Sequence, residues 1–191
     1  MGSMKIHTTP LAGLMVIETT PIRDERGQFV RVFCQNEYAE VRPQLHWEQI
    51  NVSDTTHKGS VRGMHFQYPP SAEAKLIRCL RGRVFDVAVD LRVGSPTFLQ
   101  WYGIELSQDE RMQFFIPEGF AHGFQALTDN AQLLYLHTCE WDRQHEGALR
   151  HDDPALSIAW PLPVTKLSDK DRLTPLIDGT FNGIQLNEEP L

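Results

Sequence analysis

The 191-residue sequence has no long apolar run and no cluster of basic residues. Without a stretch of about eighteen or more apolar residues, no membrane-spanning helix and no membrane partner are expected. The N-terminus shows no basic region followed by an apolar stretch, which predicts no secretory signal and a cytoplasmic location. The formal net charge is -7, which argues against nucleic acid as a partner.

Cysteine is scarce, because Cys34, Cys79 and Cys139 are an odd number at wide spacings. None belongs to a Cys-x-x-Cys pair, the spacing typical of zinc or redox sites, so we interpret all three as reduced structural thiols. Helical periodicity is also scarce. Only residues 36–41 favour a short helix, which would end before Pro43.

The composition is that of an ordinary globular protein, with 41% hydrophobic and 23% charged residues. A chain of this length fits one domain with a packed core. Residues 1–4 resemble an expression scar and are set aside. We expect a single domain over residues 5–191, in which residues 160–191, rich in Pro, Asp and Lys, form a C-terminal wrap.

From residue 47 onward, short apolar and β-branched runs alternate with clusters of Gly, Pro, Asn, Asp and Ser. The expected strands are residues 47–52, 61–67, 75–80, 84–91, 101–106, 112–116, 122–127 and 132–138. Many short antiparallel strands protect their edges by closing into a barrel or doubling into a jelly roll. The expected fold class is therefore mostly β, with few short helices.

Side-chain alternation places several polar groups on one face of these strands. Gln49, Asn51 and Ser53 project together from one strand, His65 projects from a second, and Tyr135 and His137 project from a third. A polar side chain inside a barrel costs free energy unless it is paired, hydrated or bound to a ligand. Any one of these residues alone is more often a core residue, so the prediction of a small-ligand pocket rests on the set.

His65 suits the role of a base, because imidazole titrates near neutrality and a carboxylate can fix its tautomer. Asp171 is a candidate for that carboxylate, although it equally fits an exposed acid in the tail. Tyr135 suits an acid on the opposite face, and Lys75 suits stabilisation of an enolate by charge. The alternative for Tyr135 is an ordinary barrel aromatic, and the alternative for Lys75 is a solvated lysine at a strand end.

Arg26 and Arg62 are candidates for phosphate contacts, because a guanidinium can bind phosphate with two hydrogen bonds. Surface solubility is their alternative role. Arg62 lies an odd number of residues from His65, so strict alternation turns it away from the pocket. A bulge at Gly63 is needed to bring both side chains to one pocket.

The sequence offers few candidate metal ligands at a suitable spacing. Gln67 stands where a His-x-His pair would supply a second ligand after His65, and His122 alone adds little. We predict no metal and no cofactor.

Several longer motifs resemble the dTDP-4-dehydrorhamnose 3,5-epimerases, a metal-independent cupin family. The most specific are SVRGMHFQ at residues 60–67, GRVFDVAVDLR at 82–92 and IPEGFAHGF at 116–124. Further matches lie at residues 24–27, 49–51, 74–76, 95–98, 134–135, 152–154, 160–161 and 167–171. The motifs keep the family's order over most of the chain.

The resemblance implies a cupin-type jelly-roll barrel that inverts C3 and C5 of dTDP-4-keto-6-deoxy-D-glucose to give dTDP-4-keto-L-rhamnose. It implies that His65, supported by Asp171, removes the proton beside the 4-keto group. Lys75 then resembles the enolate stabiliser, Tyr135 the acid on the opposite face, and His122 a pocket residue near the sugar.

The resemblance also implies a homodimer whose N-terminal segments reach across to the partner. The residues that match nucleotide-holding positions are Arg26, Phe29, Gln49, Asn51 and Arg62. Two positions depart from the family pattern: Arg31 stands where an acid is common, and Trp141, also expected to contact substrate, stands where tyrosine is common. Both departures concern recognition of the nucleotide.

Three other interpretations remain open at this stage. One is an epimerase that inverts only C3 or only C5 of a related nucleotide-linked keto-deoxy sugar. The second is a sugar-binding cupin without catalytic activity, and the third is a metal-dependent cupin oxygenase.

Overall fold

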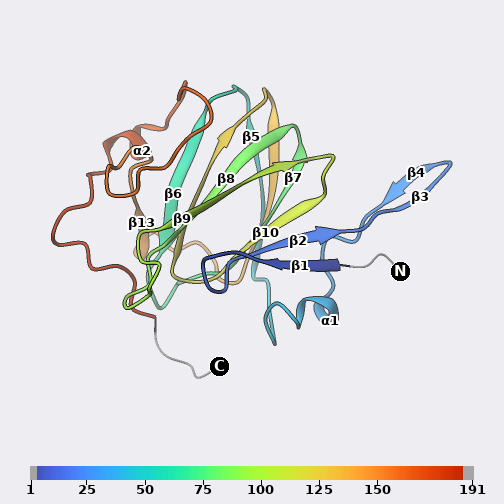
Figure 1. Cartoon of the computed structure of the whole chain (residues 1–191), viewed down its shortest axis with the longest axis horizontal. Coiled ribbons are helices and arrows are strands. Elements are labelled where there is room, and N and C mark those ends of the chain that lie inside the picture. The colour runs from blue at the N-terminus through green and yellow to red at the C-terminus, as the bar shows by residue number, and fades with distance from the viewer. Residues whose placement is uncertain (1–3, 187–191) are drawn as a thin grey trace.

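The structure, a computed structural model, describes residues 4–186 and contains short strands with two brief helices (Figure 1). The strands are β1 (Met4–Thr8), β2 (Met15–Thr19), β3 (Ile22–Asp24), β4 (Gly27–Phe29), β5 (Gln49–Thr55), β6 (Val61–Gln67), β7 (Lys75–Arg81), β8 (Arg83–Asp90), β9 (Trp101–Ser107), β10 (Met112–Ile116), β11 (Phe120–Ala126), β12 (Ala131–His137) and β13 (Glu146–Ala148). The helices are α1 (Gln35–Tyr38) and α2 (Asp169–Leu173). In this part of the chain, neither helix is long and apolar enough to cross a membrane.

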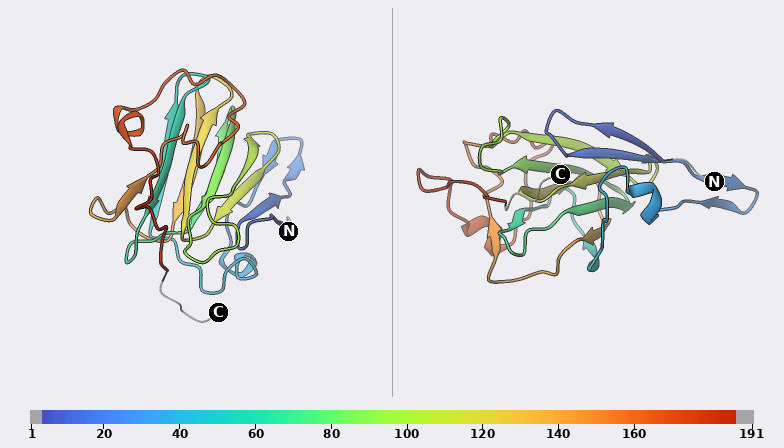
Figure 2. Two further views of the ribbon diagram at one scale, coloured as in Figure 1. Left: turned by 60° about the vertical axis from the view of Figure 1, so that its left-hand side comes forward. Right: turned by 90° about the horizontal axis from the view of Figure 1, so that it is seen from below.

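Two antiparallel sheets pack face to face and form the body of the jelly roll (Figures 1 and 2). The six-stranded sheet has the order β1-β2-β10-β7-β12-β5, and the five-stranded sheet has the order β13-β6-β11-β8-β9. Neighbouring strands in both sheets are mostly distant in sequence, as a doubled sheet that protects its edges requires. The expected mostly β class is confirmed.

The strands expected at residues 61–67 and 112–116 have those bounds, and the other expected strands differ only at their ends. Five strands, β1 to β4 and β13, were not expected. β3, β4 and β13 have three residues each, too few to show alternation. The expected helix over residues 36–41 is α1, which is shorter and begins one residue earlier.

The first strand begins inside the segment that the sequence analysis set aside. Met4 pairs with Thr19 of β2, so this residue takes part in the sheet. Residues 1–3 lie outside the described part of the chain, as do residues 187–191 of the expected C-terminal wrap. Cys34, Cys79 and Cys139 are free thiols, as expected.

Three apolar clusters hold the sheets in place. The central cluster lies between the sheets and includes Phe114 of β10 and Phe124 of β11, both almost fully buried. A second cluster lies under α1 on the outer face of the six-stranded sheet, and a third lies under the C-terminal tail on the five-stranded sheet. Because the central cluster fills one end of the interior, the other end is left for polar side chains.

The C-terminal tail runs along the outside of the five-stranded sheet and is tied to it by backbone hydrogen bonds. The Thr165 N–H donates to the Gly59 carbonyl at 3.0 Å, and the Leu162 N–H donates to the Gln125 side chain at 2.9 Å. Further on, the Ile184 N–H donates to the Leu91 carbonyl. These contacts fix the position of α2 beside β6 (Figure 1).

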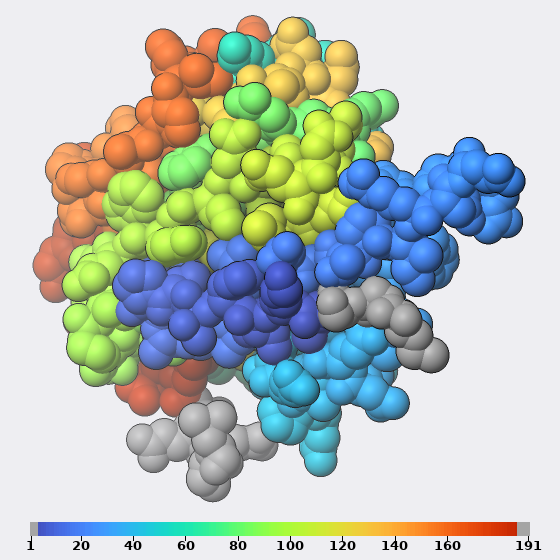
Figure 3. Space-filling view, turned by 45° about the vertical axis from the view of Figure 1, so that its right-hand side comes forward, coloured from blue at the N-terminus to red at the C-terminus, as the bar shows by residue number. Residues whose placement is uncertain are grey.

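The β3–β4 hairpin stands clear of the rest of the molecule (Figures 1 and 3). Its two strands pair only with each other among the described residues. Ile22 is 51% exposed and Phe29 is 66% exposed, so the hairpin presents apolar side chains to solvent.

Candidate active site

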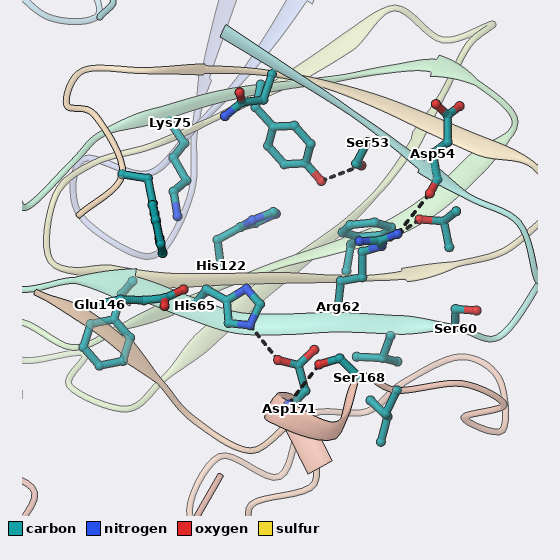
Figure 4. Close-up of a pocket in the computed structure, with 18 of the residues that line it drawn as sticks. Ser53, Asp54, Ser60, Arg62, His65, Lys75, His122, Glu146, Ser168 and Asp171 are labelled. Atoms are coloured by element: carbon teal, nitrogen blue, oxygen red, sulfur yellow. Dashed lines mark hydrogen bonds and ion pairs between the residues drawn. The ribbon is translucent and has the colours of Figure 1, made fainter. Parts of the chain in front are cut away.

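A pocket of about 630 Å³ opens between the two sheets, at the end that the central cluster does not fill. Strands β5, β6, β7, β11 and β12 contribute to its walls, and residues 166–168 and Asp171 of the tail complete them (Figure 4). The predicted site residues that line the pocket are His65, Asp171, Tyr135, Lys75, Gln49, Asn51, Arg62, His122 and Trp141. Nine of the eleven predicted site residues therefore line one pocket.

A bulge at Gly63 brings Arg62 and His65 to the same pocket, as the sequence analysis required. The pairing of β6 with β11 shifts register between His122 and Phe124. Gly63 has φ +116°, and a Cβ there would lie 2.6 Å from the Gly123 Cα. Only glycine fits this backbone conformation and this close approach.

His65 is paired with Asp171, because His65 Nε2 lies 2.6 Å from Asp171 Oδ1. Burial raises the pKa of Asp171, but the hydrogen bond and charge of His65 and the Gly63 N–H outweigh it, so the pKa lies below its ordinary value. An ionised carboxylate only accepts hydrogen bonds, so the shared proton belongs to His65 Nε2. Nδ1 of the neutral ring is then left to accept a proton.

Asp171 is held by the first turn of α2. The side chain of Ser168, the N-cap residue, accepts a hydrogen bond from the Asp171 N–H at 3.0 Å. The Gly63 N–H lies 3.4 Å from Asp171 Oδ2. These contacts orient the carboxylate toward His65 and leave its side chain only 4% exposed.

Tyr135 occupies the other side of the pocket. Its hydroxyl lies 3.2 Å from Ser53 Oγ, and Ser53 lies across from His65 in Figure 4. Burial raises the pKa of Tyr135 far above its ordinary value, although the hydrogen bond with Ser53 lowers it in part. The phenol therefore keeps its proton over the whole working range of pH.

His122 lies opposite His65 in the pairing of β11 with β6, and its side chain is 8% exposed. Its Nε2 bonds to Asp86 Oδ1 at 2.5 Å. Burial lowers the pKa of His122, and the charge and hydrogen bond of Asp86 raise it only in part, so this ring stays neutral near pH 7. Within residues 4–186, no group of three or more His, Cys, Asp and Glu side chains is placed to hold a metal ion.

Lys75 lines the pocket, and its side chain points into it in the close-up (Figure 4). Its side chain is 9% exposed, and its Nζ lies 3.1 Å from Glu73 Oε1. A buried ammonium facing a pocket is suited to stabilise negative charge that develops on a bound oxygen.

Arg62 is fixed against β5 by two hydrogen bonds. Its Nε donates to Thr55 Oγ1 at 3.1 Å, and its Nη2 donates to the Asp54 carbonyl at 3.0 Å. The guanidinium therefore lies at the pocket wall in a defined orientation, which suits it to bind phosphate oxygens.

Gln49 and Trp141 lie next to each other at the mouth of the pocket. The Trp141 N–H donates to Gln49 Oε1 at 3.1 Å, and the Trp141 side chain is 57% exposed. Asn51 follows on the same face of β5. An exposed indole beside amide groups offers both a stacking surface and hydrogen bonds to a planar ring.

The remaining predicted residues, Arg26 and Phe29, lie on the β3–β4 hairpin and do not line this chain's own pocket. Arg26 is exposed, and its Nη2 lies 2.5 Å from Asp24 Oδ2. Arg31, just beyond the hairpin, pairs with Glu37 at 2.6 Å. The structure therefore separates the N-terminal candidates from the rest of the site.

Alternation places Ser53 on the face of Asn51 and His137 on the face of Tyr135, although neither was assigned a role. The pocket residues that escaped the sequence prediction include Glu73, Asp86 beside the pocket, Glu146, Lys166 and Ser168. Some carried a signal. Asp86 interrupts the apolar run of β8, and an acid in such a run is usually paired. Glu73 lies two residues before Lys75, which places both on one side of an extended chain.

Comparison with known proteins matches most of the chain to one family. The sequence profile of the dTDP-4-dehydrorhamnose 3,5-epimerase family matches residues 8–178. The dTDP-4-dehydrorhamnose 3,5-epimerase of Shigella flexneri is 41% identical over 169 residues, which are 88% of this chain and 93% of that protein.

Two solved structures are similar to this chain. The dTDP-6-deoxy-D-glucose-3,5-epimerase of Legionella pneumophila, solved with dTDP-4-keto-L-rhamnose, has a TM-score of 0.89 and 39% identity, covering 97% of this chain and 100% of its own. A 3'-monoepimerase from Streptomyces bikiniensis, solved with dTDP-quinovose, has a TM-score of 0.84 and 31% identity, covering 89% and 86%.

Proposed function

The chain belongs to the dTDP-4-dehydrorhamnose 3,5-epimerase family, and we propose that it inverts C3 and C5 of dTDP-4-keto-6-deoxy-D-glucose to give dTDP-4-keto-L-rhamnose. It is an isomerase with the cupin-type jelly roll of its structural relatives. The proposed residue roles rest on two groups of side chains that lie on opposite sides of the pocket. His65 with Asp171 lies on one side, and Tyr135 with Ser53 lies on the other.

His65 is the base. Its neutral ring accepts the proton from the carbon beside the ketone, and Asp171 stabilises the imidazolium that forms. C3 and C5 both flank the C4 ketone, so removing a proton from either carbon gives an enolate on the same oxygen. The positive charge of Lys75 stabilises that oxygen.

Tyr135 is the acid that completes the inversion. His65 removes a proton from one face of the carbon, and Tyr135 delivers its proton to the opposite face of the same carbon. The enolate then returns to the ketone. Each inversion leaves His65 protonated and Tyr135 as a phenolate. Exchange of both protons with water restores the starting state, so the substrate gains one solvent proton at each inverted carbon.

The nucleotide lies toward the mouth of the pocket in this proposal. Arg62, fixed by Thr55 and Asp54, binds the diphosphate, and Trp141 stacks on the base beside Gln49. His122 remains neutral, and because its Nε2 hydrogen is donated to Asp86, its Nδ1 is left to accept a hydrogen bond from a sugar hydroxyl.

A homodimer accounts for the hairpin residues. A two-stranded hairpin has little stability alone, yet β3–β4 stands clear of its own chain with exposed apolar side chains. Ile50 and Val52 on the outer face of the edge strand β5 are also exposed, at 64% and 54%. We propose that the hairpin packs on a second copy, where Arg26 and Phe29 join the nucleotide site.

The single-centre epimerase remains the rival function, because the 3'-monoepimerase relative is 31% identical over most of the chain. Solvent exchange separates the two. The protein is incubated with dTDP-4-keto-6-deoxy-D-glucose in deuterated water, and label at C3 and C5 is followed by NMR, with His65→Ala as the inactive control.

Label at both carbons, with formation of the L-rhamno product, is the expected result. Label at one carbon alone would make the chain a single-centre epimerase. Binding of the nucleotide sugar without any exchange would make it a sugar-binding protein and overturn the proposal.

A further inference from the structure

Glu73 holds two other pocket residues at once. Glu73 Oε1 lies 3.1 Å from Lys75 Nζ, and Glu73 Oε2 lies 2.7 Å from His137 Nδ1. All three side chains line the same pocket as His65 and Tyr135, and each is less than 15% exposed, at 9%, 9% and 13%. The reaction described above uses Lys75 and leaves Glu73 and His137 without a role.

The backbone fixes this arrangement. His137 of β12 lies directly opposite Lys75 of β7 in the antiparallel pairing, so their side chains are neighbours on one face. The loop that carries Glu73 is tied to the same place, because the Ala74 N–H donates to Thr138 Oγ1 at 2.8 Å and the Thr138 N–H donates to the Ala74 carbonyl. The carboxylate is therefore held between the two strands.

Glu73 is ionised in this setting. Burial raises its pKa, but the hydrogen bond from His137 and the charge of Lys75 outweigh burial, so the pKa lies below its ordinary value. An ionised carboxylate requires that His137 Nδ1 carry the hydrogen that joins them. Because Glu73 balances the charge of Lys75, protonation of His137 decides whether the group of three is neutral or positive.

Resting on the proposed function, we propose that Glu73 is a positioning residue, which aims the Lys75 ammonium at the enolate oxygen and holds the His137 ring beside it. A lysine side chain has several freely rotating bonds, and its charge stabilises an enolate only if it is already in place when the enolate forms. One carboxylate oxygen of Glu73 contacts Lys75 Nζ and the other contacts His137 Nδ1. Glu73 therefore restrains the direction of the Lys75 side chain and also balances its charge.

The groups that face His137 come from three strands and one loop. Lys75 faces it from β7, Glu73 faces it from the loop before β7, and Tyr135 stacks on it along β12 with ring centroids 6.0 Å apart. β5 presents the amide of Gln49 at the paired position. Of these neighbours, Glu73 is the one anion.

The test is Glu73→Gln, which keeps the shape of the side chain and removes its charge. Glu48→Gln is the matched control, because Glu48 lies next to His137 on the backbone, with its N–H donating to the His137 carbonyl at 2.8 Å. The Glu48 side chain is 49% exposed, pairs with His46 and does not line the pocket.

Two readouts are followed in the full-length protein. The first is the set of NMR signals of the His137 ring, assigned by their loss in His137→Gln. Removing the carboxylate oxygen that lies 2.7 Å from His137 Nδ1 changes these signals in Glu73→Gln and leaves them in place in Glu48→Gln. The second is turnover, where we expect kcat to fall about 10- to 100-fold in Glu73→Gln with KM changed less than about threefold.

Unchanged His137 ring signals or an unchanged kcat in Glu73→Gln would overturn the proposal. A fall in kcat that only matches a loss of folded protein, measured by unfolding, would overturn it as well, because that is a structural effect. If the parent protein itself shows no exchange at C3 or C5, the proposed function fails first, and the His137 ring signals still report separately whether Glu73 contacts that ring.

Discussion

The hydroxyl of Tyr135 lies 3.2 Å from Ser53 Oγ, on the side of the pocket that faces His65. Burial raises the pKa of this phenol, so its proton is kept until a strong base, such as an enolate carbon, forms beside it. The base and the acid of the proposed reaction are thus separate groups on separate walls, and each can be removed alone.

Tyr135→Phe is expected to exchange the proton beside the ketone with solvent while net inversion slows by about 10²- to 10³-fold, because the base is intact and only the acid is lost. Deuterium incorporation and product formation are measured in the same sample. Ser53→Ala, which removes only the hydrogen-bond partner, is the control and should slow inversion less. An equal loss of exchange and inversion would remove Tyr135 from the role of acid.

Asp171→Asn is expected to lower kcat by about 10²- to 10⁴-fold, because a neutral amide neither stabilises the His65 imidazolium nor fixes its tautomer. Asp169→Asn is the matched control on the same helix, since Asp169 is 83% exposed and pairs with Arg172. Steady-state rates of the two variants are compared with the parent. Similar rates in all three proteins would show that the Asp171 carboxylate is dispensable.

The same carboxylate makes stability depend on pH. The pKa of Asp171 is lower in the folded protein than in the unfolded chain, so its ionisation stabilises the fold above the unfolded value of about 4. That contribution is lost as pH falls from about 4 through the folded pKa. The free energy of unfolding of Asp171→Asn should therefore approach that of the parent below about pH 4, and a constant difference down to acid pH would contradict this.

Gly63→Ala is expected to lower the free energy of unfolding by about 3 kcal/mol or more, because it combines a strained φ with a clash against β11. Gly94→Ala is the control: Gly94 has φ +78°, and nothing lies within 4 Å of the added Cβ. It should cost only about 1 kcal/mol. Denaturant unfolding of both variants gives the comparison, and equal losses would mean that the close approach to Gly123 is unimportant.

Val52→Glu is expected to convert the proposed dimer to a monomer, because it places a charge on the exposed apolar face of β5. Val93→Glu is the control, since Val93 is 47% exposed in the loop between β8 and β9. Sedimentation measures the mass of each protein. A parent protein that sediments as a monomer would remove the assigned role of the hairpin in a second copy's pocket.

The sequence predicted those features that local patterns determine. The strand over residues 61–67 was recognised because a short apolar run lies between turn-forming residues, and the bulge at Gly63 followed from two polar residues at an odd spacing around a glycine. Several of the residues that line the pocket were found because a polar residue on the inner face of a strand stands out among apolar neighbours.

The features that the sequence did not determine depend on contacts between distant segments. Asp171 was equally consistent with an exposed acid, because nothing near it indicates that the tail crosses β6. Glu73 has a spacing that favours the side of Lys75, but it precedes the expected strand, and nothing in the sequence showed that its carboxylate contacts both Lys75 and His137. Arg26 and Phe29 do not line the pocket of their own chain. In the proposed dimer they join the pocket of a second copy, a contact that the structure of one chain does not contain.

His65 and Asp171 are 106 residues apart in the chain, and α2 follows every strand of both sheets. During synthesis at about 5 to 20 residues per second, the ribosome adds Asp171 roughly 5 to 20 s after His65. The strands that enclose the pocket can pair in that interval, while the base still lacks its carboxylate. The two sheets can therefore form before the proposed catalytic pair of His65 and Asp171 is complete, and that pair is completed only when the tail that carries α2 packs beside β6.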